Sequence, residues 1–213
     1  LDELMDSLLL DRLPTLSQLG ATLAELSQGA EDTDPILHSF KNAQQLRVGV
    51  RDILGKELIE ATTGALSDIA QACLQQITQS EYEKLVAKLG EPTVGSPPPD
   101  DELQTPLFVT PTPDRIGQTC EMAIVAMGKF GGRELNYYSD LDIIFLYEAE
   151  GPTLSARRSK RETITTNQHF FSELGQRIIK SATYLGPNGR LYQIDPRLRP
   201  TGKSGNLARS LEE

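Results

Sequence analysis

Helical spacing of apolar positions runs through the first ninety residues of the chain. Apolar residues recur there at steps of three and four, which places them on one face of an α-helix. The clearest stripes cover 36–54, 66–77 and 82–89, and weaker ones cover 1–10 and 16–26. Gly55 and Gly64 lie where breaks between helices are expected, and Gly90 ends the last stripe. The pattern therefore predicts a helical N-terminal subdomain over residues 1–90, with these stripes packed in its core.

Proline interrupts this pattern in residues 91–115. Seven prolines fall in the stretch, at positions 92, 97, 98, 99, 106, 111 and 113. Proline has no backbone N–H and is disfavoured inside helices and central strands. We therefore expect residues 91–115 to be a loop or linker.

Short apolar runs of the kind found in buried strands appear only after the linker. Two of them are 122–127 (MAIVAM) and 143–147 (IIFLY), and a third is 191–194 (LYQI), which follows a Pro-Asn-Gly turn signal. An amphipathic stripe over 170–182 predicts a helix before the third strand. The predicted fold class is α+β, with a core of a small mixed sheet and flanking helices over residues 116–213.

Charge and composition exclude several kinds of partner. The formal net charge is −9 over 213 residues, whereas a long nucleic acid requires a broad basic surface. No apolar run approaches the ~18 residues of a membrane span, so we expect no membrane contact. Cys73 and Cys120 have no metal-ligand spacing, and Cys73 fits the apolar face of a helix as a buried thiol. Since the two histidines also lack ligand spacing, aspartates remain as the candidate catalytic ligands.

A glycine-rich turn follows the first predicted strand directly. It begins with Gly128 and Lys129 and continues through two further glycines. Glycine lets a backbone approach an anion closely, and exposed N–H groups can then hold phosphate. The turn matches neither the phosphate loop of P-loop proteins nor the dinucleotide-binding motif, so alone it is a weak signal.

Three aspartates are the candidate catalytic and metal-binding residues. Asp140 and Asp142 stand two apart at the start of the second strand, so in extended chain their carboxylates face the same way. Like charges so close are costly unless they bind a cation, and hard oxygen ligands suit Mg²⁺ or Mn²⁺. Asp195 ends the third predicted strand and supplies a third carboxylate if the two strands are neighbours. Taken alone, an Asp-x-Asp pair is more often two surface aspartates in contact with water.

Two arginines follow Asp195 closely in the sequence. Arg197 and Arg199 stand two and four positions after Asp195. If the chain stays extended through the prolines, all three side chains lie on the same side. Guanidinium groups suit phosphate oxygens and the charge that develops on a pyrophosphate leaving group. The alternative is that both arginines pair with surface acids.

The combined motifs resemble the glutamine synthetase adenylyltransferase family. Its signature is similar to the segment that carries the glycine turn, Glu134, Leu135, Asn136, Ser139, Asp140 and Asp142. A second block of resemblance runs from Phe170-Phe171 through Gly175-Gln176-Arg177 to Tyr192, Asp195, Arg197, Leu198, Arg199 and Pro200. The helical run from Phe40 to Leu54 resembles the family as well.

This resemblance implies a function and a site. It implies a nucleotidyltransferase fold like that of DNA polymerase β, with Asp140, Asp142 and Asp195 binding the metal. Gly128 and Lys129 would occupy the glycine turn, and Ser139 and Arg197 would contact the triphosphate of ATP. The implied reaction moves AMP from ATP to a tyrosine hydroxyl of glutamine synthetase and releases pyrophosphate. The family also implies the PII signalling protein as a partner, and the cytoplasm as location.

Alternatives remain at this stage. Family members contain two related halves, one that adenylylates glutamine synthetase and one that removes AMP with phosphate, and both use the same three aspartates. Residues 1–6 resemble the segment that leads into the C-terminal, adenylylating half. The chain opens on Leu1 and stops soon after Arg199, so we expect a C-terminally truncated piece of a longer polypeptide. A catalytically silent nucleotide-sensing or docking module is a third hypothesis, which the retained carboxylates disfavour.

Overall fold

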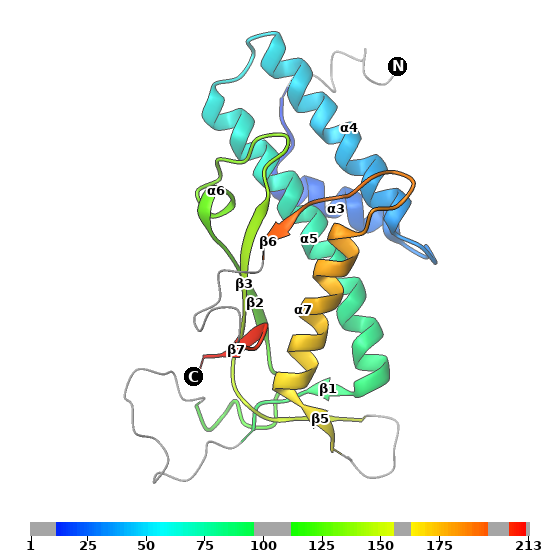
Figure 1. Cartoon of the computed structure of the whole chain (residues 1–213), viewed down its shortest axis with the longest axis vertical. Helices are drawn as coiled ribbons and strands as arrows, with labels where there is room; N and C mark the ends of the chain where they lie inside the picture. Colours follow the sequence, from blue (N-terminus) through cyan, green and yellow to red (C-terminus); the bar gives the residue numbers. More distant parts are fainter. Residues whose placement is uncertain (1–11, 96–111, 156–162, 196–204, 212–213) are drawn as a thin grey trace. The chain divides into compact units, whose positions relative to one another are not determined.

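The computed structural model describes residues 12–95, 112–155, 163–195 and 205–211. The helices are α3 (Leu16–Ser27), α4 (Asp34–Ile53), α5 (Ile59–Leu89), α6 (Gly128–Gly131) and α7 (Asn167–Thr183). The strands are β1 (Glu91–Pro92), β2 (Met122–Ala126), β3 (Leu141–Tyr147), β4 (Pro152–Leu154), β5 (Thr163–Thr166), β6 (Ile194–Asp195) and β7 (Ala208–Ser210). Figure 1 follows these elements along the chain. The chain forms two compact units: the first unit holds 12–79, 126–142 and 179–195, and the second unit holds the other described residues.

Helices α3, α4 and the first part of α5 supply most of the core of the first unit. Helix α3 begins with a capping box, in which Thr15 Oγ1 accepts from the Gln18 N–H (3.3 Å) and Gln18 Oε1 accepts from the Thr15 N–H (2.9 Å). The stripes over 16–26 and 36–54 are confirmed as helices, while the stripe over 1–10 lies outside the described residues. The buried side chains are Leu19, Leu23, Leu37, Phe40, Val48, Leu66, Ile69, Cys73 and Leu74.

Helix α5 corrects one expectation. The stripes over 66–77 and 82–89 belong to a single helix of 31 residues, and Gly64 lies inside it instead of at a break. Neither glycine nor proline occurs between Gly64 and Gly90, and one glycine inside a long helix costs only about 1 kcal/mol. The predicted end is confirmed: Gly90 has φ +75°, and a Cβ there would lie 2.6 Å from the carbonyl oxygen of Leu154.

The second unit contains a three-stranded sheet and an aromatic core. Strand β4 pairs antiparallel with both β1 and β5. Strand β1 occupies the first residues of the predicted linker, so the loop begins later than expected; residues 96–111 lie outside the described part. Helix α7 confirms the stripe over 170–182. Its Phe171 stacks on Tyr147 with ring centroids 5.0 Å apart.

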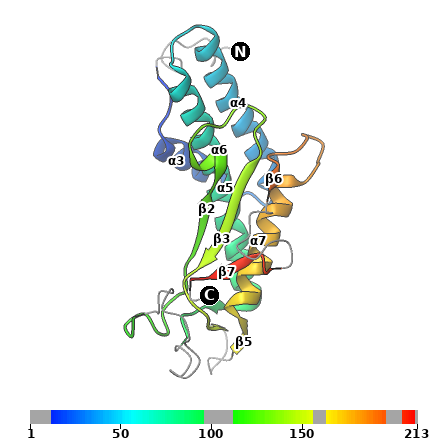
Figure 2. The ribbon, with the colours of Figure 1, turned by 60° about the vertical axis from the view of Figure 1, so that its left-hand side comes forward.

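Strand β3 takes part in both units and is the centre of the second sheet. Its order is β2-β3-β6, and β7 also pairs with β3. The Met127 N–H donates to the Asp142 carbonyl oxygen and the Glu148 N–H to that of Glu121, which is the antiparallel register of β2 and β3. Strands β6 and β7 pair parallel with β3, at its beginning and at its end respectively. Figure 2 shows β2 and β3 side by side from a second direction.

The predicted strands are confirmed with shifted limits. Strand β2 covers most of 122–127, and β3 begins two residues before the predicted 143–147 and so includes Asp142. The third strand was expected over 191–194 but consists of Ile194–Asp195 alone, because Tyr192 and Gln193 bond to separate parts of the chain instead of one ladder. Sequence reasoning did not predict α6, β4, β5 or β7.

Helices and strands together confirm the α+β class. The division into a helical subdomain, a linker and a catalytic core stays a prediction. Among the described residues, no helix combines the length and the apolar character that crossing a membrane requires.

Candidate functional site

The glycine turn lies against one of the predicted catalytic carboxylates. A Cβ built on Gly128 would lie 2.5 Å from Asp142 Oδ2, closer than side chains tolerate. Gly128 also has φ +50°, in the left-handed region that favours glycine. The backbone conformation at position 128 therefore favours glycine, and any Cβ there would displace the Asp142 carboxylate, which lies against the turn.

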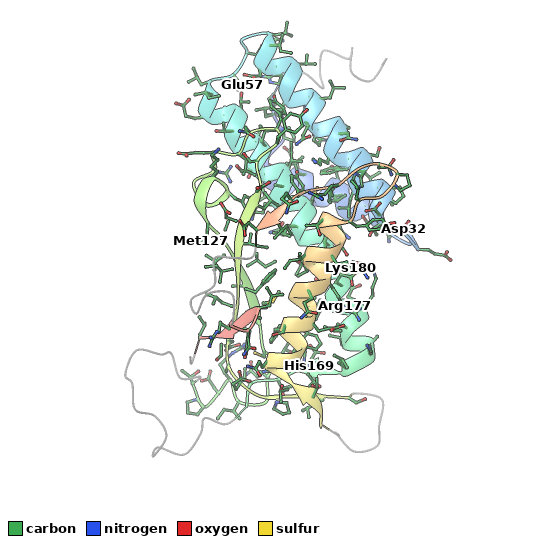
Figure 3. All side chains as sticks on the ribbon, viewed as in Figure 1. Asp32, Glu57, Met127, His169, Arg177 and Lys180 are labelled. Atoms are coloured by element: carbon green, nitrogen blue, oxygen red, sulfur yellow. The ribbon has the colours of Figure 1, made fainter. Side chains whose placement is uncertain are left out.

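Backbone contacts fix the turn to the sheet. Met127, labelled in Figure 3, joins β2 to α6, and its N–H donates to the Asp142 carbonyl oxygen (2.8 Å). A Cβ on Gly131 would lie 2.5 Å from the Ala126 carbonyl oxygen, so this glycine lets α6 close tightly onto the end of β2. Lys129 lies between these two glycines and is exposed. The turn thus carries one exposed cation directly after the glycine that lies against the Asp142 carboxylate.

A second turn leads into β3 and carries Ser139 and Asp140. Ser139 Oγ accepts from the Asn136 N–H (3.0 Å), and Asn136 Oδ1 accepts from the Tyr138 N–H (3.0 Å). The Ser139 oxygen is therefore held by the backbone, while its hydroxyl hydrogen can still be donated to a ligand. Asp140 is exposed and immediately precedes β3.

Strand pairing brings Asp142 and Asp195 together. In the parallel pair of β3 and β6, Asp142 is the register partner of Asp195 and Leu141 that of Ile194. Register partners on adjacent strands point to the same face of a sheet. The buried Leu141 and Ile194 face the core, so the two half-buried aspartates face the other way. Carboxylates 53 positions apart in the sequence are thus neighbours in the first unit, as predicted.

The metal-binding role of the three aspartates stays a prediction. Within the described residues, no group of three or more His, Cys, Asp and Glu side chains is arranged to hold a metal ion. The chemistry of the paired carboxylates still suits Mg²⁺, which commonly takes one or two protein carboxylates and completes its shell with water and substrate phosphates. Arg197 and Arg199 lie outside the described residues.

An open cleft that Gly132 of the glycine turn helps to line has the wrong charge for a triphosphate. It has a volume of about 680 Å³ and lies between the start of α5 and the residues after α6. Its charged side chains are Glu57, Glu60, Asp68, Glu134, Arg12 and Arg133. Acids outnumber bases there, and neither Asp142 nor Asp195 contributes to its wall. We therefore place the candidate site at the carboxylate pair and not in this cleft.

Sequence reasoning missed two residues that shape the site. Arg133 has φ 58°, and its guanidinium makes two hydrogen bonds to the Asp68 carboxylate on α5 (2.8 and 3.0 Å). Lys41 of α4 donates to the carbonyl oxygen of Leu191, four positions before Asp195. Neither leaves a signal in the sequence, because both depend on contacts with segments more than sixty positions away.

Comparison with known proteins first gives the class of enzyme: the matches are nucleotidyltransferases. The sequence profile described as glutamate-ammonia ligase adenylyltransferase matches residues 1–213. The chain belongs to this family, which confirms the resemblance drawn from its motifs.

Curated relatives carry one common name. A bifunctional glutamine synthetase adenylyltransferase/adenylyl-removing enzyme of Vibrio parahaemolyticus is 33% identical over 216 residues, covering 96% of this chain and 20% of its own length. Enzymes of the same name from Pseudomonas putida and Burkholderia mallei are 33% and 34% identical, covering 94% and 92% of this chain. The chain spans about a fifth of the length of these relatives, 20%, 18% and 19% respectively.

Proposed function

We propose that this chain is the nucleotidyl-transfer segment of an enzyme that moves AMP from ATP to a tyrosine hydroxyl of glutamine synthetase. Pyrophosphate is the second product. The observation that carries the proposal is the pairing of Asp142 with Asp195 beside a glycine that contacts the Asp142 carboxylate. Membership of the adenylyltransferase family supports it, and a polymerase β-like core is part of the same proposal.

Each site residue has a proposed role. Asp140, Asp142 and Asp195 are the proposed catalytic carboxylates and would hold Mg²⁺ or Mn²⁺. A divalent ion bound there would supply positive charge to the triphosphate and lower the pKa of the attacking hydroxyl. Gly128 and Lys129 receive the phosphates at the turn, and Ser139 donates its hydroxyl hydrogen. Arg197 and Arg199 stabilise the charge of the leaving pyrophosphate.

Removal of AMP is the one alternative reaction that an observation favours. The names of the relatives pair adenylyl transfer with adenylyl removal. Phosphorolytic removal of AMP from glutamine synthetase, with ADP as product, uses the same carboxylates. We propose the transfer direction, because residues 1–6 resemble the segment before the C-terminal half. Action in the cytoplasm and control by PII belong to the same proposal.

A pair of labelled-nucleotide assays tests both directions. In the first, ATP labelled on the α-phosphate is incubated with unmodified glutamine synthetase and Mg²⁺. In the second, adenylylated glutamine synthetase is incubated with phosphate, and ADP is measured. Label transfer supports the proposal, and ADP formation without label transfer supports the removal direction. No product in either assay, with the chain folded and both substrates intact, contradicts a catalytic role for this segment.

Asparagine variants test whether AMP transfer depends on the proposed carboxylates. We expect Asp142→Asn and Asp140→Asn to lower transfer by at least about 100-fold, since each removes a proposed metal ligand. The melting temperature should stay unchanged or rise, because repulsion between like charges is relieved. Asp32→Asn is the matched control: Asp32 is exposed, labelled in Figure 3, and accepts from the Asp34 N–H (3.0 Å), which asparagine can still do. Normal transfer by Asp142→Asn would remove the proposed site.

A further inference from the structure

Two contacts hold the half-buried side chain of Lys41 of α4 in the first unit. Its ammonium group donates to the Leu191 carbonyl oxygen and lies 4.3 Å from the centroid of the Tyr192 ring. Leu191 and Tyr192 are themselves buried, at 1% and 9% exposure. A carbonyl and an aromatic face are both attractive to a cation, so together they hold the ammonium in one place.

Removing the Lys41 ammonium from water costs free energy. Burial lowers the pKa of Lys41, partly offset by the nearby Cys73 on α5. Burial also raises the pKa of Cys73 to about 12 and that of Tyr192 well above its ordinary value, so both groups are neutral near pH 7. Among the described residues, the Leu191 carbonyl oxygen and the Tyr192 ring contact the Lys41 ammonium and offset part of its loss of water.

Lys41 contacts the segment 191–195, which ends with Asp195. Backbone hydrogen bonds hold the same segment. The Tyr192 N–H donates to the Ala182 carbonyl oxygen (2.9 Å), and the Gln193 carbonyl oxygen accepts from the Leu141 N–H (2.8 Å). Strand β6 then consists of Ile194 and Asp195 alone. With so short a ladder, a fixed point at Leu191 determines how far the segment can slide along β3.

We propose that Lys41 is a positioning residue that fixes the 191–195 segment and thereby the place of Asp195 opposite Asp142. It touches neither carboxylate and acts through the backbone. The catalytic consequence rests on the proposed function, whereas the structural tether does not. The two parts are therefore measured separately.

Hydrogen exchange tests the tether without reference to activity. In Lys41→Met, which keeps an apolar side chain of similar length, the amides of Tyr192 and Leu141 should exchange at least about tenfold faster than in the wild type. Lys41→Arg keeps a charged donor and should restore slow exchange. Lys180→Met is the matched control, because Lys180 is exposed on α7 (Figure 3). Unchanged exchange in Lys41→Met overturns the tether.

Steady-state AMP transfer tests the catalytic consequence. A displacement of Asp195 by about 1 Å should lower kcat by about 10- to 100-fold while KM for ATP changes less than about threefold. Lys41→Arg should recover kcat to within about threefold of the wild type, and Lys180→Met should not alter it. Fast exchange with a normal kcat overturns the positioning role.

Two further outcomes remain informative. If Lys41→Met does not fold, Lys41→Gln takes its place, because the glutamine side chain is too short for a good hydrogen bond to the Leu191 carbonyl oxygen. Amide exchange and kcat equal to those of the wild type would then overturn the proposal. A wild-type chain that is inactive in both assay directions contradicts the proposed function alone. In that case the exchange measurement still decides whether Lys41 tethers the segment.

Discussion

The substitution Gly128→Ala tests two effects separately: the strain of the left-handed backbone, and the contact of a Cβ with the Asp142 carboxylate. The substitution adds one methyl group to a backbone with φ +50° and places it 2.5 Å from Asp142 Oδ2. The left-handed backbone costs an L-residue about 1–2 kcal/mol, which lowers the free energy of unfolding by that amount. Asp142 Oδ2 is at the end of a side chain, so it can turn away at little further cost to stability.

The effect on activity should be larger. To reach an ordinary contact of 3.4 Å, the Asp142 oxygen must move by roughly 1 Å. A displacement of this size at a reacting centre lowers rates by about 100-fold, equivalent to about 2.7 kcal/mol of transition-state stabilisation. Gly128→Ala should therefore lose far more activity than its loss of stability explains.

Gly55 provides a matched control for the backbone term. It has φ +62°, and nothing lies within 4 Å of a Cβ built on it. Gly55→Ala should lose a similar 1–2 kcal/mol of unfolding free energy and keep its activity. Urea unfolding, AMP transfer and the rise in melting temperature with ATP and Mg²⁺ are measured for both variants. If Gly128→Ala transfers AMP within about threefold of Gly55→Ala, the Asp142 carboxylate does not act where the structure places it.

Three further predictions concern stability. Burial raises the pKa of Cys73 from 9.0 to about 12, so this thiol stabilises the fold fully below pH 9 and loses that contribution as pH rises towards 12. Relative to Cys73→Ala, the unfolding free energy of the wild type should fall by about 1.4 kcal/mol between pH 8 and pH 10 in urea titrations, and parallel curves would refute this. Arg133→Gly should be about 1 kcal/mol more stable than Arg133→Ala. Both variants lose the ion pair with Asp68, but only glycine adopts φ 58° without strain. Equal urea midpoints would show that this backbone is not strained. Thr15→Ala should cost about 1 kcal/mol through loss of the α3 cap, measured by the same titration, and an unchanged midpoint would mean that the cap contributes nothing.

The sequence predicted best where a pattern is local and repeated. The stripe over 36–54 became α4, and the apolar run IIFLY became most of β3, because burial on one face or both decides each element. The unbroken α5 was missed because Gly64 looked like a break, although tertiary packing compensates for the weak propensity of one glycine. Strands β4, β5 and β7 are three or four residues long and depend on partners far along the chain.

The candidate site was predictable in its residue types and less so in its geometry. The position of Asp142 at the start of one strand and of Asp195 at the end of another was predicted correctly. The contact between Gly128 and Asp142 followed from no sequence rule, since it depends on how closely α6 folds back onto β3. Lys41 was seen only as one residue of a helix, because its acceptor lies 150 positions away.

The brevity of β6 has a thermodynamic consequence for substrate binding. Two ladder residues can detach for far less free energy than unfolding the whole unit requires, so we expect a small population in which Asp195 is not paired with β3. If ATP binds only the paired form, as the proposed function requires, its apparent dissociation constant rises by the inverse of the paired fraction. Any contact that shortens the time β6 spends detached therefore strengthens nucleotide binding from a distance, without touching the nucleotide.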